Sequence, residues 1–334
     1  MKKILILGDG GWGTALAILL HEKGHNVTLW GHSPQYVEYL SKHRENIKYL
    51  PDIAIPNNLT ITSDMSSALN GAEYIVAAVP TPFLRLVIKD LKEYYTPGIP
   101  IICVAKGIEN DTLLCGSQII RDVLGKQPIA VLFGPSHAEE VARKLPTTVV
   151  ASSQDLSLAK QVQDIFITNR FRVYTNPDTI GVELGAALKN VIAIAAGICD
   201  GLGFGDNSKA ALITRGLAEI TRLGVAMGAK KSTFSGLTGL GDLITTCVSP
   251  YGRNRFVGEQ IGKGKKLNEI LAQMEQVAEG VLTTKSVCAL ADKYKVEMPI
   301  TREVYKTLFE DKSPLQAVSD LMMRAPRSEV EELE

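Results

Sequence analysis

The stretch ILILGDGGWG at residues 4–13 decides the fold of this chain. A short apolar run leads directly into Gly8, Gly10 and Gly13, which have the spacing G-x-G-x-x-G, and residues 14–23 then have the apolar spacing of a helix. In such a turn the first glycine permits the tight bend, the second lets the backbone approach a pyrophosphate, and the third allows close helix–strand packing. The helix N-terminus would offer N–H groups and a positive dipole to the phosphates. A purely structural turn is the alternative, but strand, turn and helix in this order predict a dinucleotide site.

Outward from this turn, the first half of the chain alternates short runs rich in Val and Ile with helical stretches. That alternation is typical of a parallel sheet wrapped by helices. The expected strands are 4–7, 27–30, 74–79, 101–104, 129–132 and 147–151, with 172–174 as a possible edge strand.

After about residue 178 the strand pattern fades and long helical patterns follow. We therefore expect a Rossmann-type, doubly wound, mostly parallel α/β sheet over residues 1–180, followed by an all-α domain over 181–328 and a solvated acidic tail, Glu329–Glu334. The expected helices are 179–199, 208–227, 254–262, 267–273, 283–294, 298–309 and 314–322.

Composition narrows the class of protein. The chain has 334 residues, 45% of them hydrophobic and 22% charged, and its 36 basic and 36 acidic residues cancel. This balance gives no global attraction to nucleic acid or to an anionic membrane. Five scattered cysteines argue against a disulfide framework and against a zinc site, and no metal is expected. The apolar run at 4–7 is too short for a signal peptide, so we expect a cytoplasmic protein.

The end of the second expected strand bears on the choice of cofactor. Many NAD enzymes place an acidic residue there to bind the ribose hydroxyls. Here Trp30 is followed by Gly31, His32 and Ser33, without an acid to repel a 2′-phosphate and with a histidine that could donate to it. No arginine follows, so both NAD and NADP stay open.

Lys189 stands in an apolar helical stretch, LGAALKNVIAIAAGIC (184–199), whose only polar side chains are Lys189 and Asn190. An ammonium buried there costs several kcal/mol unless it is paired, and burial lowers its pKa toward the range useful for proton transfer. One interpretation is therefore a catalytic lysine. The other is a lysine that reaches the helix surface or forms a structural ion pair. The stretch is also shorter than the roughly 20 residues of a membrane span.

Three further polar clusters follow apolar segments. Lys106 comes at the carboxyl end of an expected strand, where open α/β sheets bind ligands. The next strand leads into FGPSHAEE (133–140), in which His137 is tempting as an acid or base but is more simply structural. In the third cluster, LTGLGDLITTC (237–247) and GRNR (252–255), Asp242 could orient a lysine and Arg253 could bind a phosphate. Each cluster could also be an ordinary surface loop.

Together these motifs resemble one family, the bacterial NAD(P)-dependent sn-glycerol-3-phosphate dehydrogenases. The resemblance runs nearly end to end and implies a helical domain of the 6-phosphogluconate dehydrogenase type. It also implies NAD(P)H as cofactor, reduction of dihydroxyacetone phosphate to sn-glycerol 3-phosphate for phospholipid synthesis, and a homodimer. The motifs that carry it are the glycine turn, YLP (49–51), VAKGIE (104–109), FGPSHAEEVA (133–142), the stretch 184–219, LTGLGDLITTC, GRNR and VAEGVLTT (277–284).

The resemblance also implies the site residues. Lys189 would be the proton donor and acceptor, Lys106 would act on the substrate, and Asp242 would orient Lys189. The substrate-binding set would be Lys106, Gly134, Ser136, Lys189, Asp242, Gly252, Arg253 and Asn254. The cofactor-binding set would be Gly8, Gly10, Gly11, Trp12, Gly13, His32, Lys106, Ala138, Arg253, Val277 and Glu279.

This chain departs from the family at three places. Gly11 and Gly252 stand where serine is common, and Phe133 and His137 exchange the usual polar and aromatic positions around Gly134–Ser136. We expect these changes to affect affinity rather than the reaction. The alternatives are a related β-hydroxyacid or sugar-acid dehydrogenase, and a non-catalytic dinucleotide sensor, which would have little use for Lys189, Asp242 and Arg253 together.

Overall fold

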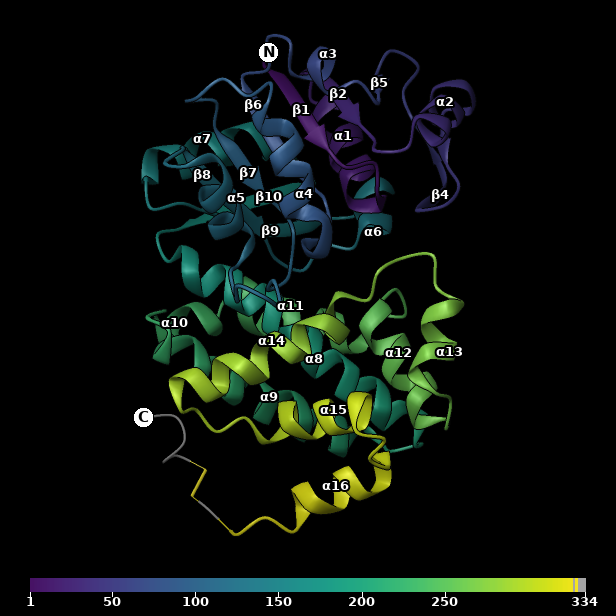
Figure 1. The fold of residues 1–334 in the computed structure, drawn as a ribbon, viewed down its shortest axis with the longest axis vertical. Coiled ribbons are helices and arrows are strands. Elements are labelled where there is room, and N and C mark those ends of the chain that lie inside the picture. The colour runs from purple at the N-terminus through teal and green to yellow at the C-terminus, as the bar shows by residue number, and fades with distance from the viewer. Residues whose placement is uncertain (327, 330–334) are drawn as a thin grey trace. The chain divides into compact units, whose positions relative to one another are not determined.

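The computed structural model describes residues 1–326, 328 and 329, so the expected acidic tail lies outside the described residues from position 330 onward. The chain divides into two compact units (Figure 1). The first, the sheet unit, comprises Met1–Lys106 and Gly116–Thr179. The second, the helical unit, comprises Gly107–Cys115 and the chain from Ile180 onward.

Over the described part of the chain, eight strands of the sheet unit form one sheet in the order β10-β9-β8-β7-β6-β1-β2-β5. Every neighbouring pair is parallel except β8 and β9, which are antiparallel, so the expected mostly parallel sheet is confirmed. The central strands carry Val, Ile and Leu on both faces because helices cover the sheet. The strands are β1 Lys3–Leu7, β2 Asn26–Trp30, β5 Thr60–Thr62, β6 Tyr74–Ala77, β7 Ile101–Cys103, β8 Ile129–Phe133, β9 Thr147–Ser152 and β10 Phe171–Asn176.

Short helices connect these strands, and a small hairpin lies beside the sheet. The hairpin, β3 (Glu45–Asn46) with β4 (Leu50–Ala54), and the edge strand β5 were not expected, because the three strands are short and the hairpin carries Pro51. The helices are α1 Gly11–Glu22, α2 Pro34–His43, α3 Met65–Leu69, α4 Thr81–Lys92, α5 Gly116–Leu124, α6 Ala138–Ala142 and α7 Leu156–Phe166.

The helical unit is built around α8 (Thr179–Gly201), which is long and apolar enough to span a membrane but whose most apolar 18-residue window is completely buried within the structure. Such burial is that of a core helix. The remaining elements are α9 Asp206–Ala226, α10 Lys231–Phe234, a π-helical turn at Leu237–Gly241, α11 Asp242–Val248, α12 Arg253–Gly262, α13 Leu267–Ala272, α14 Glu279–Tyr294, α15 Pro299–Phe309 and α16 Pro314–Met322 (Figure 1).

Glycines fix the approach of α12 to α8. A Cβ built on Gly197 would lie 1.9 Å from the carbonyl oxygen of Arg255, and one built on Gly258 would lie 2.0 Å from that of Ile194. Since a real Cβ never comes so close, only glycine lets the two backbones touch. This contact places the beginning of α12, where Arg253 and Asn254 lie, beside the central helix.

The segment Gly107–Cys115, which the sequence placed within the first domain, belongs to the helical unit. Ile108 and Cys115 are buried in the apolar core of that unit. Ser286 of α14 donates hydrogen bonds to the carbonyl of Ile108 at 3.1 Å and to the side chain of Asn110 at 2.6 Å. The place of this segment in the helical unit could not be predicted from the sequence, because the segment contacts residues almost 180 positions later in the chain.

Candidate active site

The glycine turn is held tightly at the carboxyl end of β1. Gly8 has φ +112°, and a Cβ there would lie 2.8 Å from the carbonyl oxygen of Ala78. A Cβ on Gly13 would lie 1.9 Å from the oxygen of Gly8. The turn and the first turn of α1 thus pack against each other at distances that exclude side chains.

The same turn fits the phosphates of a dinucleotide. No side chain caps the N-terminus of α1, and the space around Gly10 is open to 4 Å from its Cβ position. The Nε1 atom of Trp12 is buried and has no hydrogen-bond partner among the described residues. Open space, backbone N–H groups and an unused indole donor together suit a bound polar group.

Gly11 is explained by its surroundings. A Cβ at this position would lie 2.5 Å from the carbonyl oxygen of Tyr49 and 3.7 Å from the Cβ of Ala138. The hairpin therefore leaves no room for a side chain at position 11. The structure also brings Gly11 and Ala138, two of the expected cofactor-binding residues, side by side.

A carboxylate that was not expected from the sequence lies beside the end of β2 and comes from the glycine turn. His32 packs edge-on to Trp30, with ring centroids 6.3 Å apart. The carboxylate of Asp9 lies against Gly31, where a Cβ would be 2.4 Å from Oδ2. An acidic side chain therefore does lie beside the residues that follow β2. The signal was Asp9 itself, an acid inside the glycine turn.

Lys106, Gly134 and Ser136 come together at the carboxyl ends of β7 and β8. The Lys106 ammonium donates to the carbonyl oxygen of Gly134 at 3.0 Å, and the Ser136 hydroxyl donates to the same oxygen at 2.9 Å. Gly134 has φ +149°, and a Cβ would lie 2.9 Å from Cα of Val149. His137 begins α6 as its N-cap residue. The carboxyl ends of β7 and β8 thus carry an ammonium and a hydroxyl that both donate a hydrogen bond to one carbonyl oxygen.

Lys189 of α8 lies in the core of the helical unit, with only 4% of its surface exposed. Its Nζ is 3.0 Å from Oδ1 of Asp242, which is 2% exposed, and donates to Oγ1 of Thr246 at 2.5 Å. The ammonium is thus buried and paired, so it does not reach the helix surface, whereas a catalytic lysine and a structural ion pair both fit this geometry. We call Lys189, Asp242 and Thr246 the lysine cluster.

The lysine cluster depends on α11, which was not among the helices expected from the sequence. The π-helical turn Leu237–Gly241 leads into α11, which buries Leu243 and Cys247. Asp242 and Thr246 are four residues apart and therefore share one helix face, a spacing that could have identified Thr246 from the sequence. Burial raises the pKa of Cys247 to about 12 even though Lys189 opposes the shift, so this thiol is no nucleophile near neutral pH.

The other expected residues of the helical unit gather at the N-termini of α12 and α14. Gly252 is the N-cap residue of α12, and a Cβ there would lie 3.0 Å from the oxygen of Thr246. The exposed Arg253 donates to the carbonyl of Val277 at 3.2 Å. The Oδ1 atom of Asn254 accepts from the N–H of Gly280, next to Glu279, at 2.9 Å. The arginine is thus accessible and anchored beside Val277.

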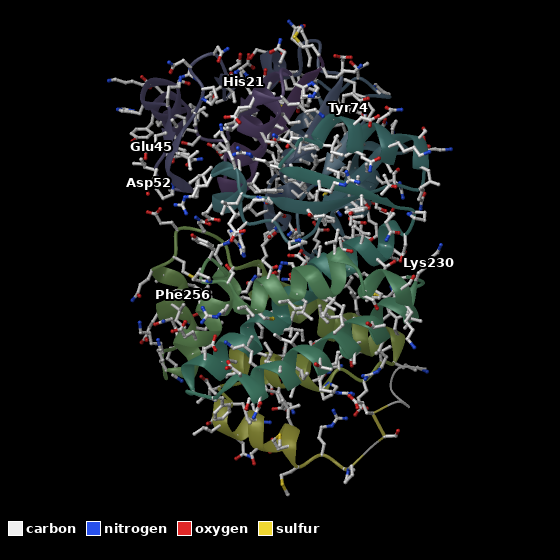
Figure 2. All side chains as sticks on the ribbon, turned by 180° about the vertical axis from the view of Figure 1, so that it is seen from behind. His21, Glu45, Asp52, Tyr74, Lys230 and Phe256 are labelled. Atoms are coloured by element: carbon white, nitrogen blue, oxygen red, sulfur yellow. The ribbon has the colours of Figure 1, made fainter. Side chains whose placement is uncertain are left out.

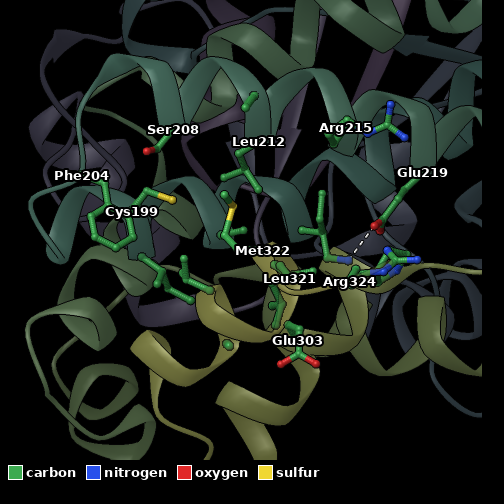
Figure 3. A pocket seen from close by; sticks show the side chains of 18 of the residues that line it. Cys199, Phe204, Ser208, Leu212, Arg215, Glu219, Glu303, Leu321, Met322 and Arg324 are labelled. Carbon is green, nitrogen blue, oxygen red and sulfur yellow. Dashed lines mark hydrogen bonds between the residues drawn. The ribbon is translucent and has the colours of Figure 1, made fainter. Parts of the chain in front are cut away.

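A cavity of about 730 Å³ lies elsewhere in the helical unit, between α8, α9, α15 and α16 (Figure 3). Arg215, Glu219 and Arg324 lie toward one end of it, and Cys199, Phe204 and Ser208 toward the other. Among the described residues, none of the expected site residues lines this cavity. It is mostly apolar and is separate from the lysine cluster.

Comparisons with known proteins agree with this arrangement. Residues 3–159 match the model of the N-terminus of NAD-dependent glycerol-3-phosphate dehydrogenase, and residues 178–319 match that of its C-terminus. The chain is 52% identical to a glycerol-3-phosphate dehydrogenase of Bacillus pumilus, covering 100% of this chain and 97% of the relative, and 52% identical to one of Prosthecochloris aestuarii, covering 98% and 99%.

Solved structures give the same answer. The crystal structure of a glycerol-3-phosphate dehydrogenase from Coxiella burnetii superposes with a TM-score of 0.93 at 41% identity, over 97% of this chain and 99% of the other. A D-mandelate dehydrogenase superposes at 0.62 with 14% identity, over 95% and 99%, and shares the fold alone. With two family models spanning most of the chain and relatives this similar over its full length, the chain belongs to the NAD-dependent glycerol-3-phosphate dehydrogenase family.

Proposed function

We propose that this chain reduces dihydroxyacetone phosphate to sn-glycerol 3-phosphate with NAD(P)H, and that it supplies glycerol phosphate for phospholipid synthesis. The observation that carries the proposal most is the lysine cluster, a buried ammonium held by a carboxylate and a hydroxyl. A charge that costs several kcal/mol to bury is retained most readily where it has a chemical task.

In this proposal the glycine turn, with Gly11, Trp12, His32 and Ala138, binds the dinucleotide, and Arg253, Val277 and Glu279 contribute from the helical unit. When bound, the reduced nicotinamide supplies a hydride to the ketone. The open space at Gly10, the uncapped N-terminus of α1 and the unused Nε1 donor of Trp12 support this placement.

Lys189 would give a proton to the substrate oxygen as the ketone becomes a hydroxyl group. Asp242 and Thr246 hold the ammonium in one position, which favours transfer because the donor does not have to be oriented during the reaction. In the reverse direction the neutral amine would accept the same proton.

Arg253 would bind the substrate phosphate. Its side chain is exposed, and it donates to the carbonyl of Val277. That carbonyl is neutral, so this contact does not compensate the charge of the guanidinium. A guanidinium can bind a phosphate through two parallel hydrogen bonds. Asn254 and the backbone at Gly252 would support it, while Lys106, Gly134 and Ser136 would hold the carbonyl end of the substrate.

The chain is proposed to act in the cytoplasm as a homodimer. The buried state of α8, its one candidate membrane span in the described residues, supports a soluble enzyme. The dimer rests on the family resemblance alone.

Initial rates decide the proposal. Oxidation of NADH and of NADPH is followed at 340 nm with dihydroxyacetone phosphate and, in parallel, with acetoacetate and other β-keto acids. We expect turnover with the triose phosphate and none above background with the keto acids. Turnover with a keto acid alone would assign a related dehydrogenase. Binding of either cofactor without any turnover would assign a dinucleotide sensor, and each of these results overturns the proposal.

A further inference from the structure

Asp9 lies inside the glycine turn, but its side chain reaches the neighbouring strand. A Cβ built on Gly31, the first residue after β2, would lie 2.4 Å from Oδ2 of Asp9 and 2.7 Å from its Cγ. The carboxylate therefore occupies the space that a side chain at position 31 would need. Glycine at this position makes room for it.

The backbone of Asp9 is fixed by a buried amide. Asn46, which is 0% exposed, donates from Nδ2 to the carbonyl oxygen of Asp9 and to Oγ1 of Thr14, both at 2.8 Å. The hydroxyl of Tyr36 donates to Oδ1 of Asn46 at 2.7 Å. Since the hairpin residue Asn46 is held from α2 as well, the backbone of the turn cannot easily rotate at Asp9.

The Asp9 carboxylate is partly buried and little used within the protein. Among the described residues, no other side chain donates a hydrogen bond to it. Burial raises the pKa of Asp9, while its own N–H and the nearby His32 and Lys48 act in the opposite direction. The Asp9 carboxylate, at the edge of the dinucleotide site, can therefore accept a hydrogen bond from a bound ligand.

Enzymes of this fold commonly bind the hydroxyls of the adenosine ribose with an acidic side chain at the end of the second strand. This chain has Gly31, His32 and Ser33 there. We propose that Asp9 supplies the missing carboxylate from the glycine turn, accepts a hydrogen bond from the ribose 2′-hydroxyl, and makes the enzyme prefer NAD(H) to NADP(H). This inference rests on the proposed function, because it needs a dinucleotide at the turn.

The neighbouring basic side chains do not reverse the expected preference. His32 and Lys48 lie close enough to act on the carboxylate electrostatically, and they help to keep it ionised. A 2′-phosphate would carry close to two negative charges to the same edge and would meet the Asp9 carboxylate there. A hydroxyl donates to that carboxylate, whereas a phosphate cannot.

The test is binding, measured on the full chain without substrate. Dissociation constants for NADH and NADPH are determined from nucleotide fluorescence, and competition with 5′-AMP and adenosine 2′,5′-bisphosphate isolates the adenosine end. We expect NADH to bind at least ~10-fold more tightly than NADPH, the scale of one hydrogen bond to a charged group. Asp9→Asn and Asp9→Ala should reduce that ratio by a similar factor, because NADH loses the hydrogen bond to the carboxylate and NADPH no longer meets a negative charge there.

Asp52→Asn is the matched control. Asp52 is an exposed aspartate of the same unit, next to Glu45 on the hairpin (Figure 2), and its backbone N–H donates to Glu45 at 3.0 Å. This variant should keep the wild-type ratio. Equal or tighter binding of NADPH by the wild type, or an unchanged ratio in both Asp9 variants, overturns the inference. Failure of the wild type to bind either nucleotide overturns the proposed function instead.

Discussion

Asp242 and Glu219 are two carboxylates of the helical unit, each only 2% exposed, yet they are held in opposite ways. Asp242 faces the ammonium of Lys189 at 3.0 Å. Glu219 accepts hydrogen bonds from the backbone N–H groups of Ile300 and Thr301, at 2.6 and 3.2 Å, and from the Thr301 hydroxyl at 3.1 Å. One carboxylate positions a cation, whereas the other caps the beginning of α15.

Under the proposed function, the difference separates a catalytic from a structural use of buried charge. The donors around Glu219 are neutral and belong to the fold, so burial dominates and raises its pKa to about 7. Asp242 instead keeps a proton-bearing amine in place. Substitution should therefore affect turnover at the lysine cluster and stability at Glu219.

The largest expected effect is that of Lys189→Met, which roughly keeps the volume and removes the proton. We expect kcat to fall at least ~10²-fold, the usual scale of acid–base catalysis, with dihydroxyacetone phosphate as substrate. Lys293→Met, the same change at an exposed position of α14, should leave kcat unchanged.

Removing one member of a buried ion pair also destabilises a protein, commonly by about 3–5 kcal/mol. Circular dichroism and NADH binding must therefore show that Lys189→Met is folded before its rate is interpreted. A folded variant with near-normal kcat would remove Lys189 from the mechanism and leave it, like Glu219, a structural charge.

A smaller effect is expected at the phosphate end. Arg253→Ala should raise KM for dihydroxyacetone phosphate by ~10-fold or more, since a charge-assisted hydrogen bond to phosphate is lost, while kcat changes less. Arg255→Ala is the control, because Arg255 lies on the same helix but pairs with Asp200 at 2.7 Å. If both variants have the same KM, the phosphate is bound elsewhere.

The smallest effect on turnover is expected for Glu219→Gln, whose kcat should equal that of the wild type. Its effect is on stability. The folded-state pKa of Glu219 is about 7 and its ordinary value is 4.5, so its protonated form is favoured in the folded state. Its contribution to the free energy of unfolding is then present below about pH 4.5 and is lost as the pH rises through 7, by up to about 3 kcal/mol.

Urea unfolding followed by circular dichroism at several pH values measures this contribution as the difference between the wild type and Glu219→Gln. The difference should shrink or change sign between pH 4.5 and pH 7. A difference that does not vary with pH would mean that the pKa of Glu219 in the folded state is not raised above its ordinary value.

Much of the fold was readable from the sequence because the signals are local. Gly8, Gly10 and Gly13 are within six residues of one another, and the strands around them are short apolar runs. Lys189 stood out because nothing else in its stretch is charged. What the sequence did not reveal depends on contacts between distant segments.

Three features illustrate that limit. The segment 107–115 joins the helical unit through contacts with α14, almost 180 residues away. The hairpin that excludes a side chain at Gly11 is made of short strands without a periodic pattern. Asp9 had no assigned role in the sequence, and only the position of Gly31 shows where its carboxylate lies.

The most direct test of the account is chemical rescue at position 189. Lys189→Ala removes the amine and leaves a cavity in the core, into which a small primary amine such as ethylamine can enter. We expect turnover of dihydroxyacetone phosphate by this variant to rise with amine concentration and to saturate, while the wild type and Lys293→Met do not respond. The contradicting result would come from a folded variant that binds NADH. If its activity without amine is close to that of the wild type and does not respond to added amine, the proton does not come from Lys189.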